Sequence, residues 1–128
     1  MTVILDSHGV TSLAGDRARL AELKNRGEWP PLVPTMVLAE ALSGDPRRDY
    51  HENRLLRTCE LRAVDEALAR EAAALRAQVR TRRTPSAVDA VVVAVADHVG
   101  GGTVLSSDPS DLRALARHTH NPVRIESV

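Results

Sequence analysis

Four acidic residues have apolar neighbours in the sequence, where an ionised carboxylate is unfavourable unless a partner compensates its charge. Asp6 follows the apolar run 3–5, and Asp108 comes two residues after the apolar run 103–106. Glu40 is the only charge in residues 35–44, and Asp89 lies among the alanines and valines of residues 87–96. Ionised carboxylates buried near one another are unfavourable unless a cation compensates them. Hard oxygen ligands without a His or Cys partner suit Mg²⁺ or Mn²⁺, and such ions support phosphodiester hydrolysis.

Each of these acids also has a purely structural interpretation. Asp6 could cap a helix that follows it, and Glu40 could pair with an arginine. Either Asp108 or Asp111 could cap a helix beginning near Leu112. The settings of the four acids, rather than their number, therefore support a site.

The helices and strands around the acids must position them. Residues 84–112, which include Asp89 and Asp108, give the clearest prediction of such elements. Thr84 can cap a helix and Pro85 suits its first position, which makes Asp89 the fifth helical residue, too deep for an ordinary cap. Three glycines at 100–102 predict the end of this helix. The apolar run 103–106 then predicts a buried strand.

The rest of the chain alternates strands with helices. Strands are expected at 2–5, 30–34, 61–64 and 122–125. Helices are expected at 10–13, 16–27, 35–44, 55–59, 65–80 and 112–117. Thr35 and Asp65 are the expected caps of two of these helices, and residues 45–54 are expected to be polar and exposed. This order predicts a three-layer α/β/α sandwich with a mostly parallel central sheet, formed by one domain over residues 1–128. Ligands bind beyond the carboxyl ends of such strands, so Asp6 and Asp108 should share a rim.

Composition limits the function classes. The net charge is zero, from 17 basic and 17 acidic residues, and the chain has no Phe, one Trp and one Tyr. This argues against nucleic-acid binders that stack bases on aromatic platforms. The lone Cys59 excludes an intramolecular disulfide and a cysteine-based zinc site. No apolar run reaches membrane length, and the first strand begins too early for a signal peptide to precede it, so we expect a cytoplasmic protein.

Four segments together resemble the PIN-domain ribonucleases, and most of all the VapC-type toxins of bacterial toxin–antitoxin pairs. They are VILDS at 3–7, VLAEALSG at 37–44, AVDAVVVAVA at 87–96 and TVLSSDPSDLRALA at 103–116. No single segment is specific, but their order and spacing cover essentially the whole chain. The resemblance implies a Mg²⁺- or Mn²⁺-dependent endoribonuclease that hydrolyses RNA. Asp6 and Asp89 would be the principal metal ligands, and Glu40 and Asp108 would complete the acidic pocket.

The resemblance also implies smaller roles and partners. Ser106 matches a hydroxyl that often accompanies the fourth acid, and Asp111 matches a further acid of some members. Where the family usually has Ser, Thr or Asn, this chain has His8, which we interpret as a hydrogen-bonding substitute rather than a metal ligand. Such toxins are typically homodimers neutralised by a small antitoxin protein.

A cluster of arginines could hold the RNA backbone through phosphate contacts. Its members follow the alanine-rich helix at 65–80 or lie at its end, and are Arg76, Arg80, Arg82 and Arg83. The alternative is a solvated helix end that favours cations.

Three other functions are compatible with parts of the sequence. A phosphohydrolase using Asp6 as a nucleophile would normally have a second Asp two residues later, where this chain has His8. A receiver domain would need a lysine near a late strand end, and Lys24 is the only lysine. A catalytically degenerate PIN domain acting as a binding or scaffold module stays open, although the complete acidic set argues against it.

Overall fold

The central sheet has five parallel strands. The computed structural model describes residues 2–128, and its sheet order is β3-β2-β1-β4-β5. The strands are β1 (Val3–Leu5), β2 (Leu32–Pro34), β3 (Glu60–Arg62), β4 (Gly102–Ser106) and β5 (Val123–Ser127). Every pairing between neighbours is parallel. The chain builds the sheet outward from β1 to β3, then returns to place β4 on the other side of β1.

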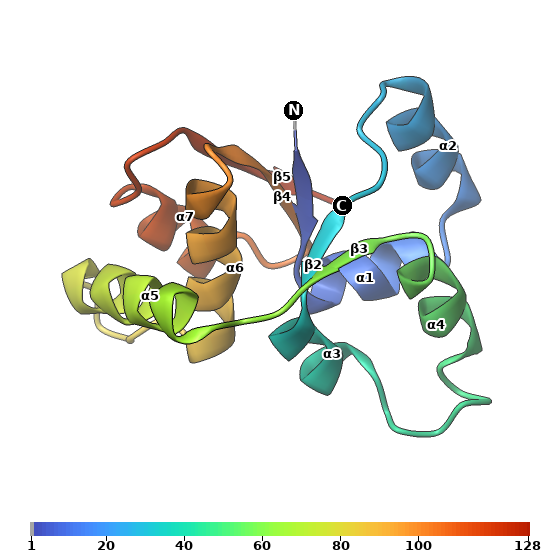
Figure 1. The fold of residues 1–128 in the computed structure, drawn as a ribbon, viewed down its shortest axis with the longest axis horizontal. Coiled ribbons are helices and arrows are strands. Elements are labelled where there is room, and N and C mark those ends of the chain that lie inside the picture. The colour runs from blue at the N-terminus through green and yellow to red at the C-terminus, as the bar shows by residue number, and fades with distance from the viewer. Residues whose placement is uncertain (1) are drawn as a thin grey trace.

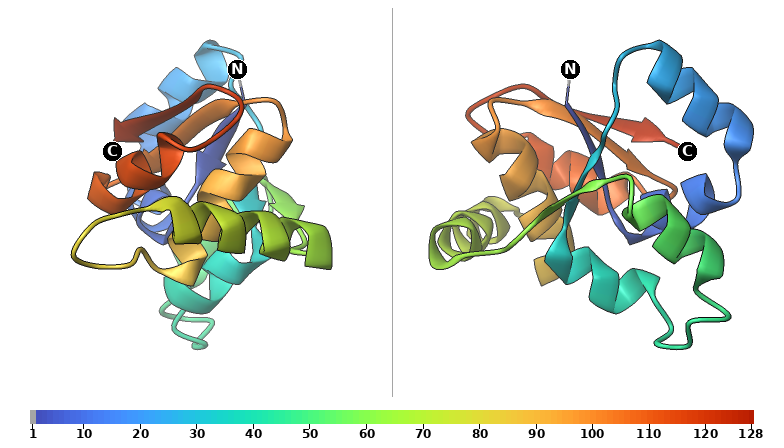
Figure 2. Two further views of the ribbon diagram at one scale, coloured as in Figure 1. Left: turned by 90° about the vertical axis from the view of Figure 1, so that its left-hand side faces the viewer. Right: turned by 45° about the vertical axis from the view of Figure 1, so that its right-hand side comes forward.

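Helices cover both faces of this sheet, as Figures 1 and 2 show. One layer holds α5, α6 and α7, and the opposite layer holds α1, α2 and α4, while α3 lies at the end of the sheet (Figure 1). The bounds are α1 (Ser7–Ala14), α2 (Arg17–Asn25), α3 (Thr35–Ala41), α4 (Tyr50–Leu56), α5 (Glu66–Gln78), α6 (Ala87–His98) and α7 (Ser110–Ala116). The predicted three-layer α/β/α sandwich is therefore confirmed, with a sheet that is wholly parallel.

The core consists of aliphatic side chains, as the composition predicts. Helix α6 is its centre: Ala90 through Ala96 are all buried, and the helix packs on β1, β2, β4 and β5. Valine and alanine are small enough for a helix to lie close to the sheet, which suits a chain without phenylalanine. Among the described residues, no helix is long and apolar enough to cross a membrane.

The start of α6 differs from the prediction. Ser86, not Thr84, is the N-cap, and its Oγ accepts the N–H of Asp89 at 3.0 Å. Pro85 therefore precedes the helix, and Asp89 is its third residue rather than its fifth. An acid in the first helical turn is favourable because the unpaired N–H groups there carry partial positive charge.

Other element ends also differ from the prediction. Helix α1 begins at Ser7, because Asp6 accepts the N–H of Gly9 and caps it. Thr35 is the first residue of α3 and makes no cap, and that helix ends at Ala41 instead of Gly44. Neither Asp108 nor Asp111 caps α7, whose N-cap position is Pro109 without a side-chain bond. The predicted cap Asp65 is confirmed. Asp16, expected as the first residue of the second helix, is instead the N-cap of α2.

The stretch predicted to be polar and exposed contains a buried acid. Asp49 is 5% exposed and accepts the N–H groups of Ser43 and Gly44 at 2.9–3.0 Å. These donors hold the pKa of Asp49 below its usual range, despite the opposing effect of burial. Helix α4 begins at the next residue, five residues earlier than expected.

Candidate active site

The candidate site lies where the order of strands reverses. Strand β1 has β2 on one side and β4 on the other, and loops leaving such a pair diverge, which opens a crevice at the carboxyl ends. Leu5 of β1 pairs with Leu105 of β4. The next residues, Asp6 and Ser106, therefore stand side by side at this rim.

Asp6 is held by its own helix and by the neighbouring strand. Its side chain is 4% exposed, and Oδ1 accepts the Gly9 N–H at 2.7 Å. Burial raises the pKa of Asp6, hydrogen bonds from Ser106 and Gly9 and the charge of His8 oppose the rise, and Glu40 adds to it. Asp6 is thus both a cap and a buried acid within the field of another carboxylate.

Gly9 permits this burial. A Cβ at this position would lie 2.5 Å from the carbonyl oxygen of Leu105, closer than real Cβ contacts. Its absence lets the first turn of α1 approach β4 directly, which places Asp6 beside Ser106.

Asp89 approaches the same rim from the start of α6. Its pKa is raised to about 6 by burial, against a hydrogen bond from Ser86, and by repulsion from Asp6, Asp111 and Glu40. Asp6, Glu40 and Asp111, which are distant from Asp89 in sequence, therefore lie close enough to repel its negative charge.

Glu40 contributes from the last turn of α3. Its side chain is exposed, and it raises the pKa values of both Asp6 and Asp89. Glu40 and Asp89 line one cavity of about 320 Å³, together with Ser7, His8, Thr11 and Ser86. The structure thus places Asp6, Glu40 and Asp89 near one another.

His8 stands at the edge of this cavity. Its Nδ1 lies 4.0 Å from Oδ2 of Asp6, and its side chain is 55% exposed. One carboxylate oxygen of Asp6 therefore caps α1, and the other faces the imidazole of His8.

Asp108 and Asp111 occupy different settings. Asp108 is exposed on the loop after β4, and its N–H donates to Oγ of Ser106 at 3.0 Å. Asp111, on the first turn of α7, is one of the acids that raise the pKa of Asp89. It also forms an ion pair with Arg83 at 3.2 Å.

The arginine cluster does not form one helix end. Helix α5 ends at Gln78, so only Arg76 lies on it, and its Nε donates to the Pro85 carbonyl at 2.8 Å. Arg83 pairs with Asp111. Arg80 and Arg82 are exposed on the loop between α5 and α6, where neither guanidinium has a hydrogen bond or ion pair within residues 2–128.

The acids are neighbours but do not yet form a coordination sphere. Within residues 2–128, no three His, Cys, Asp or Glu side chains lie close enough to hold a metal ion as they stand. The donor set consists of carboxylate oxygens, and Glu40 raises the pKa values of Asp6 and Asp89 while Asp6 raises that of Asp89. It nevertheless fits a hard divalent cation, since such an ion removes this repulsion.

Sequence reasoning missed two residues of this site. Ser86 caps α6 and hydrogen-bonds Asp89, and the pattern Ser-x-x-Asp before an apolar run is a recognised helix start. Gly9 left no such signal, because the need for a missing Cβ there arises only from the packing of α1 against β4.

Comparison with solved structures identifies the fold. VapBC of Salmonella typhimurium bound to DNA superposes with a TM-score of 0.75, at 17% identity over 99% of this chain and 98% of that chain. VapBC2 of Rickettsia felis, bound to a DNA fragment from its promoter, gives 0.72 at 11% identity over 100% and 99%. VapC20 of Mycobacterium tuberculosis, a toxin that cleaves the sarcin–ricin loop, gives 0.63 at 18% identity over 88% and 95%. Neither a family sequence model nor a curated protein sequence matches the chain. The chain therefore has a VapC-like PIN fold, as the resemblance of its segments implied.

Proposed function

We propose that this protein is a Mg²⁺- or Mn²⁺-dependent endoribonuclease that acts as the toxin of a toxin–antitoxin pair. The observation that carries the proposal is the convergence of Asp6, Glu40 and Asp89 at the strand-order reversal, where Glu40 raises the pKa values of Asp6 and Asp89 and Asp6 raises that of Asp89. The fold supports it, because chains of two VapBC structures share the fold over nearly the whole chain.

The acids would hold the cation, with Asp6 and Asp89 as principal ligands and Glu40 and Asp108 completing the set. The exposed Glu40 side chain at the end of α3 would turn inward on binding. When bound, the ion supplies Lewis-acid activation of water and of the scissile phosphate. The chain's own part is to fix the carboxylates: Ser106 and Gly9 hold Asp6, and Ser86 holds Asp89.

The RNA backbone would contact the loop between α5 and α6. Arg80 and Arg82 are exposed there, and their guanidinium groups form no ion pair within residues 2–128. They are therefore available to contact phosphate oxygens. Arg76 and Arg83 already bind Pro85 and Asp111, and we expect them to contribute less to RNA binding. A small antitoxin and a homodimeric state are further parts of the proposal that rest on the resemblance, and the VapBC structures that share the fold also support the antitoxin. The cytoplasmic location stays a prediction from the sequence.

Cleavage of a labelled single-stranded RNA by the purified protein tests this function. We expect cleavage that requires Mg²⁺ or Mn²⁺ and is lost in Asp6→Asn and Asp89→Asn. Glu66→Gln is the matched control, because Glu66 is 82% exposed and distant in sequence from the cluster. Equal cleavage by wild type and both Asn variants in EDTA would show a contaminating nuclease and overturn the assignment.

Cation binding gives a readout that does not depend on activity. A ligand that binds only the folded state stabilises it, by about 2.7 kcal/mol at a hundred times its Kd. We expect Mg²⁺ to raise the Tm of the wild type and of Glu66→Gln, but not that of Asp89→Asn. An equal rise in all three would mean that the ion binds elsewhere.

Growth separates a toxin from a scaffold. We expect expression of the wild type to arrest growth, co-expression of the small neighbouring reading frame to relieve the arrest, and Asp89→Asn to be harmless. Arrest that persists in Asp6→Asn and Asp89→Asn would favour a catalytically degenerate binding module instead.

A further inference from the structure

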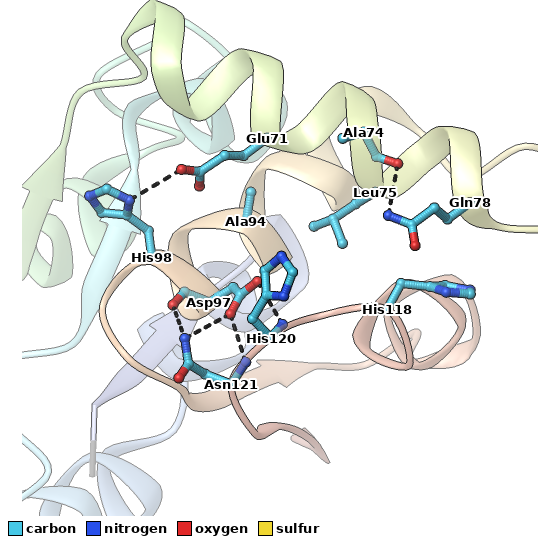
Figure 3. A pocket seen from close by; sticks show the side chains of 10 residues that line it. All are labelled: Glu71, Ala74, Leu75, Gln78, Ala94, Asp97, His98, His118, His120 and Asn121. Carbon is cyan, nitrogen blue, oxygen red and sulfur yellow. Dashed lines mark hydrogen bonds and ion pairs between the residues drawn. The ribbon is translucent and has the colours of Figure 1, made fainter.

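A second cavity lies along α6, away from the acid cluster. It has a volume of about 370 Å³ and lies between α5, α6 and the loop that joins α7 to β5. Asp97, at its wall, is eight residues beyond Asp89, which corresponds to about 12 Å along a helix. The residues that line it are Glu71, Ala74, Leu75, Gln78, Ala94, Asp97, His98, His118, His120 and Asn121 (Figure 3).

The loop on one side of this cavity is fixed in place. The carboxylate of Asp97 accepts the N–H groups of His120 at 3.1 Å and Asn121 at 2.9 Å, and the side-chain amide of Asn121 at 3.0 Å. Thr119 Oγ1 closes the turn by donating to the carbonyl oxygens of Ala116 and Asn121. A loop tied down in this way presents its side chains without a large entropic cost on binding.

Three of the five histidines of the chain line this cavity. His98 lies at the edge, where Nδ1 is 3.5 Å from Oε1 of Glu71. The imidazoles of His118 and His120 make no hydrogen bond within the described residues, and Figure 3 shows them around the same opening as the amide of Gln78. Gln78 uses its Nε2 on the Ala74 carbonyl at 3.4 Å, which leaves its amide oxygen as an acceptor.

The lining distinguishes between ligand classes. A metal ion fits poorly, because the carboxylate of Asp97 already accepts the N–H groups of His120 and Asn121 and that of Glu71 faces His98. An anion alone is opposed by Glu71 and Asp97 at the walls. A flat heterocycle fits, because Leu75, Ala74 and Ala94 offer apolar contact, the imidazoles offer flat faces, and Gln78 and the ring nitrogens offer donors and acceptors.

We propose that this cavity binds a single nucleobase, stacked on the imidazole of His118 or His120 and hydrogen-bonded at its edge by Gln78. Proteins recognise unpaired RNA bases by stacking them on aromatic side chains, histidine included, and by hydrogen bonds to their edges. The composition argues against an extended aromatic platform, but the imidazoles of His118 and His120 at this cavity offer flat faces for one base. The base would come from RNA, which rests on the proposed function, or from a free nucleotide.

Nucleotide titrations followed through the imidazole signals in ¹H–¹⁵N spectra test the site, in EDTA so that cleavage plays no part. We expect AMP, GMP, CMP or UMP to shift the signals of His118 and His120, and ribose 5-phosphate to leave them in place. His118→Leu should weaken binding about fivefold or more, the loss expected for one stacking contact, whereas His118→Phe keeps a flat face and should retain most of it. His51→Leu, a histidine of another groove, is the matched control, and Tm values show whether each variant is folded.

Three outcomes would overturn the proposal. Equal shifts with ribose 5-phosphate would show an anion site, shifts with ZnCl₂ but with no nucleotide would show a metal site, and no shift with any nucleotide at millimolar concentration would show no site. Because cleavage is not measured, failure here leaves the ribonuclease proposal intact, and failure of that proposal leaves nucleotide binding intact.

The source of the base is settled with a short unstructured RNA and the Asp89→Asn protein, in which we expect no cleavage. If His118→Leu in that background weakens RNA binding as much as mononucleotide binding, the base comes from RNA. If only mononucleotide binding weakens, the site is filled by a free nucleotide, and the nucleobase proposal still stands.

Discussion

Ser106 and Asp6 stand next to each other at the ends of two neighbouring parallel strands, and the serine hydroxyl donates a hydrogen bond to the buried carboxylate. The register that pairs Leu5 with Leu105 produces this contact. Ser106 is fully buried and also accepts the N–H of Asp108. A single hydroxyl thus connects the acid after β1 to the loop after β4.

Replacing this hydroxyl should change the ionisation of Asp6. The hydrogen bond from Ser106 opposes the effect of burial on the pKa of Asp6, so we expect Ser106→Ala to raise that pKa further. It should also lower the free energy of unfolding by about 1 kcal/mol, as for other lost hydrogen bonds. A carboxyl ¹³C titration measures the first effect and urea unfolding the second. Ser107→Ala, at an exposed neighbour, should alter neither, and an unchanged Asp6 pKa in Ser106→Ala would contradict the contact.

Asp89 should make stability depend on pH in a defined direction. Its pKa is raised from 3.8 to about 6, so between these values the folded protein binds a proton that the unfolded chain releases. The free energy of unfolding should therefore fall as pH rises from about 4 through 6. The full shift corresponds to about 3 kcal/mol, and because the side chain is only half-buried we expect on the order of 1 kcal/mol.

Urea unfolding at pH 4 to 7 measures this dependence. We expect Asp89→Asn to flatten the decrease and to be more stable than the wild type at pH 7, because Asn cannot ionise. Glu66→Gln should keep the wild-type profile. A wild-type decrease that survives unchanged in Asp89→Asn would assign it to another group, such as Asp6, whose pKa is raised in the same direction.

A glycine-to-alanine pair tests how closely α1 approaches the sheet. In Gly9→Ala the new Cβ would meet the Leu105 carbonyl oxygen at 2.5 Å, and we expect a loss of about 1–3 kcal/mol in stability, as for overpacked cores. Gly15→Ala is the matched control, because nothing lies within 4 Å of its Cβ and its φ is −102°. It should be neutral or slightly stabilising. Equal stability of the two variants, measured by urea unfolding, would mean that α1 can move away from β4 at little cost.

The ends of helices were predicted correctly where a single local signal, such as a capping residue or a run of glycines, marked them. Asp65 precedes a long alanine-rich run and caps α5 as expected, and the glycines after residue 99 end α6, with φ of 91° at Gly100 and 103° at Gly101. At the start of α6 two cap signals overlap, Thr84–Pro85 and Ser86-x-x-Asp89. The second is the one used, since Ser86 Oγ accepts the N–H of Asp89. The choice of the first led to a wrong position of Asp89 within the helix.

Features that depend on distant backbone could not be predicted. Ser7, His8 and Gly9 are poor helix formers, so periodicity placed the start of α1 too late, whereas the cap by Asp6 and the contact with β4 make them helical. Asp49 looked solvated because its partners are the backbone N–H groups of a turn. The positions of Asp6 and Asp89 near the rim could be predicted, because one follows a strand of a parallel sheet and the other lies among the buried residues of a helix on that sheet. The apolar neighbours of Glu40 in the sequence were misleading, since its side chain is exposed.

Asp108 and Asp111 are competing candidates for the fourth acid of the cluster. The sequence favours Asp108, yet Asp111 is the acid of α7 that raises the pKa of Asp89. We therefore expect Asp111→Asn to lower the pKa of Asp89, since one repulsive charge is removed, and Asp108→Asn to change it less. Loss of the carboxylate also frees Arg83, whose guanidinium lies 3.2 Å from Asp111, and the added positive charge would act in the same direction. Carboxyl ¹³C titrations of both variants measure this, with Arg83→Gln separating the two contributions. A larger effect of Asp108→Asn would instead place the β4–α7 loop over the cluster and return Asp108 to the position that the sequence predicts.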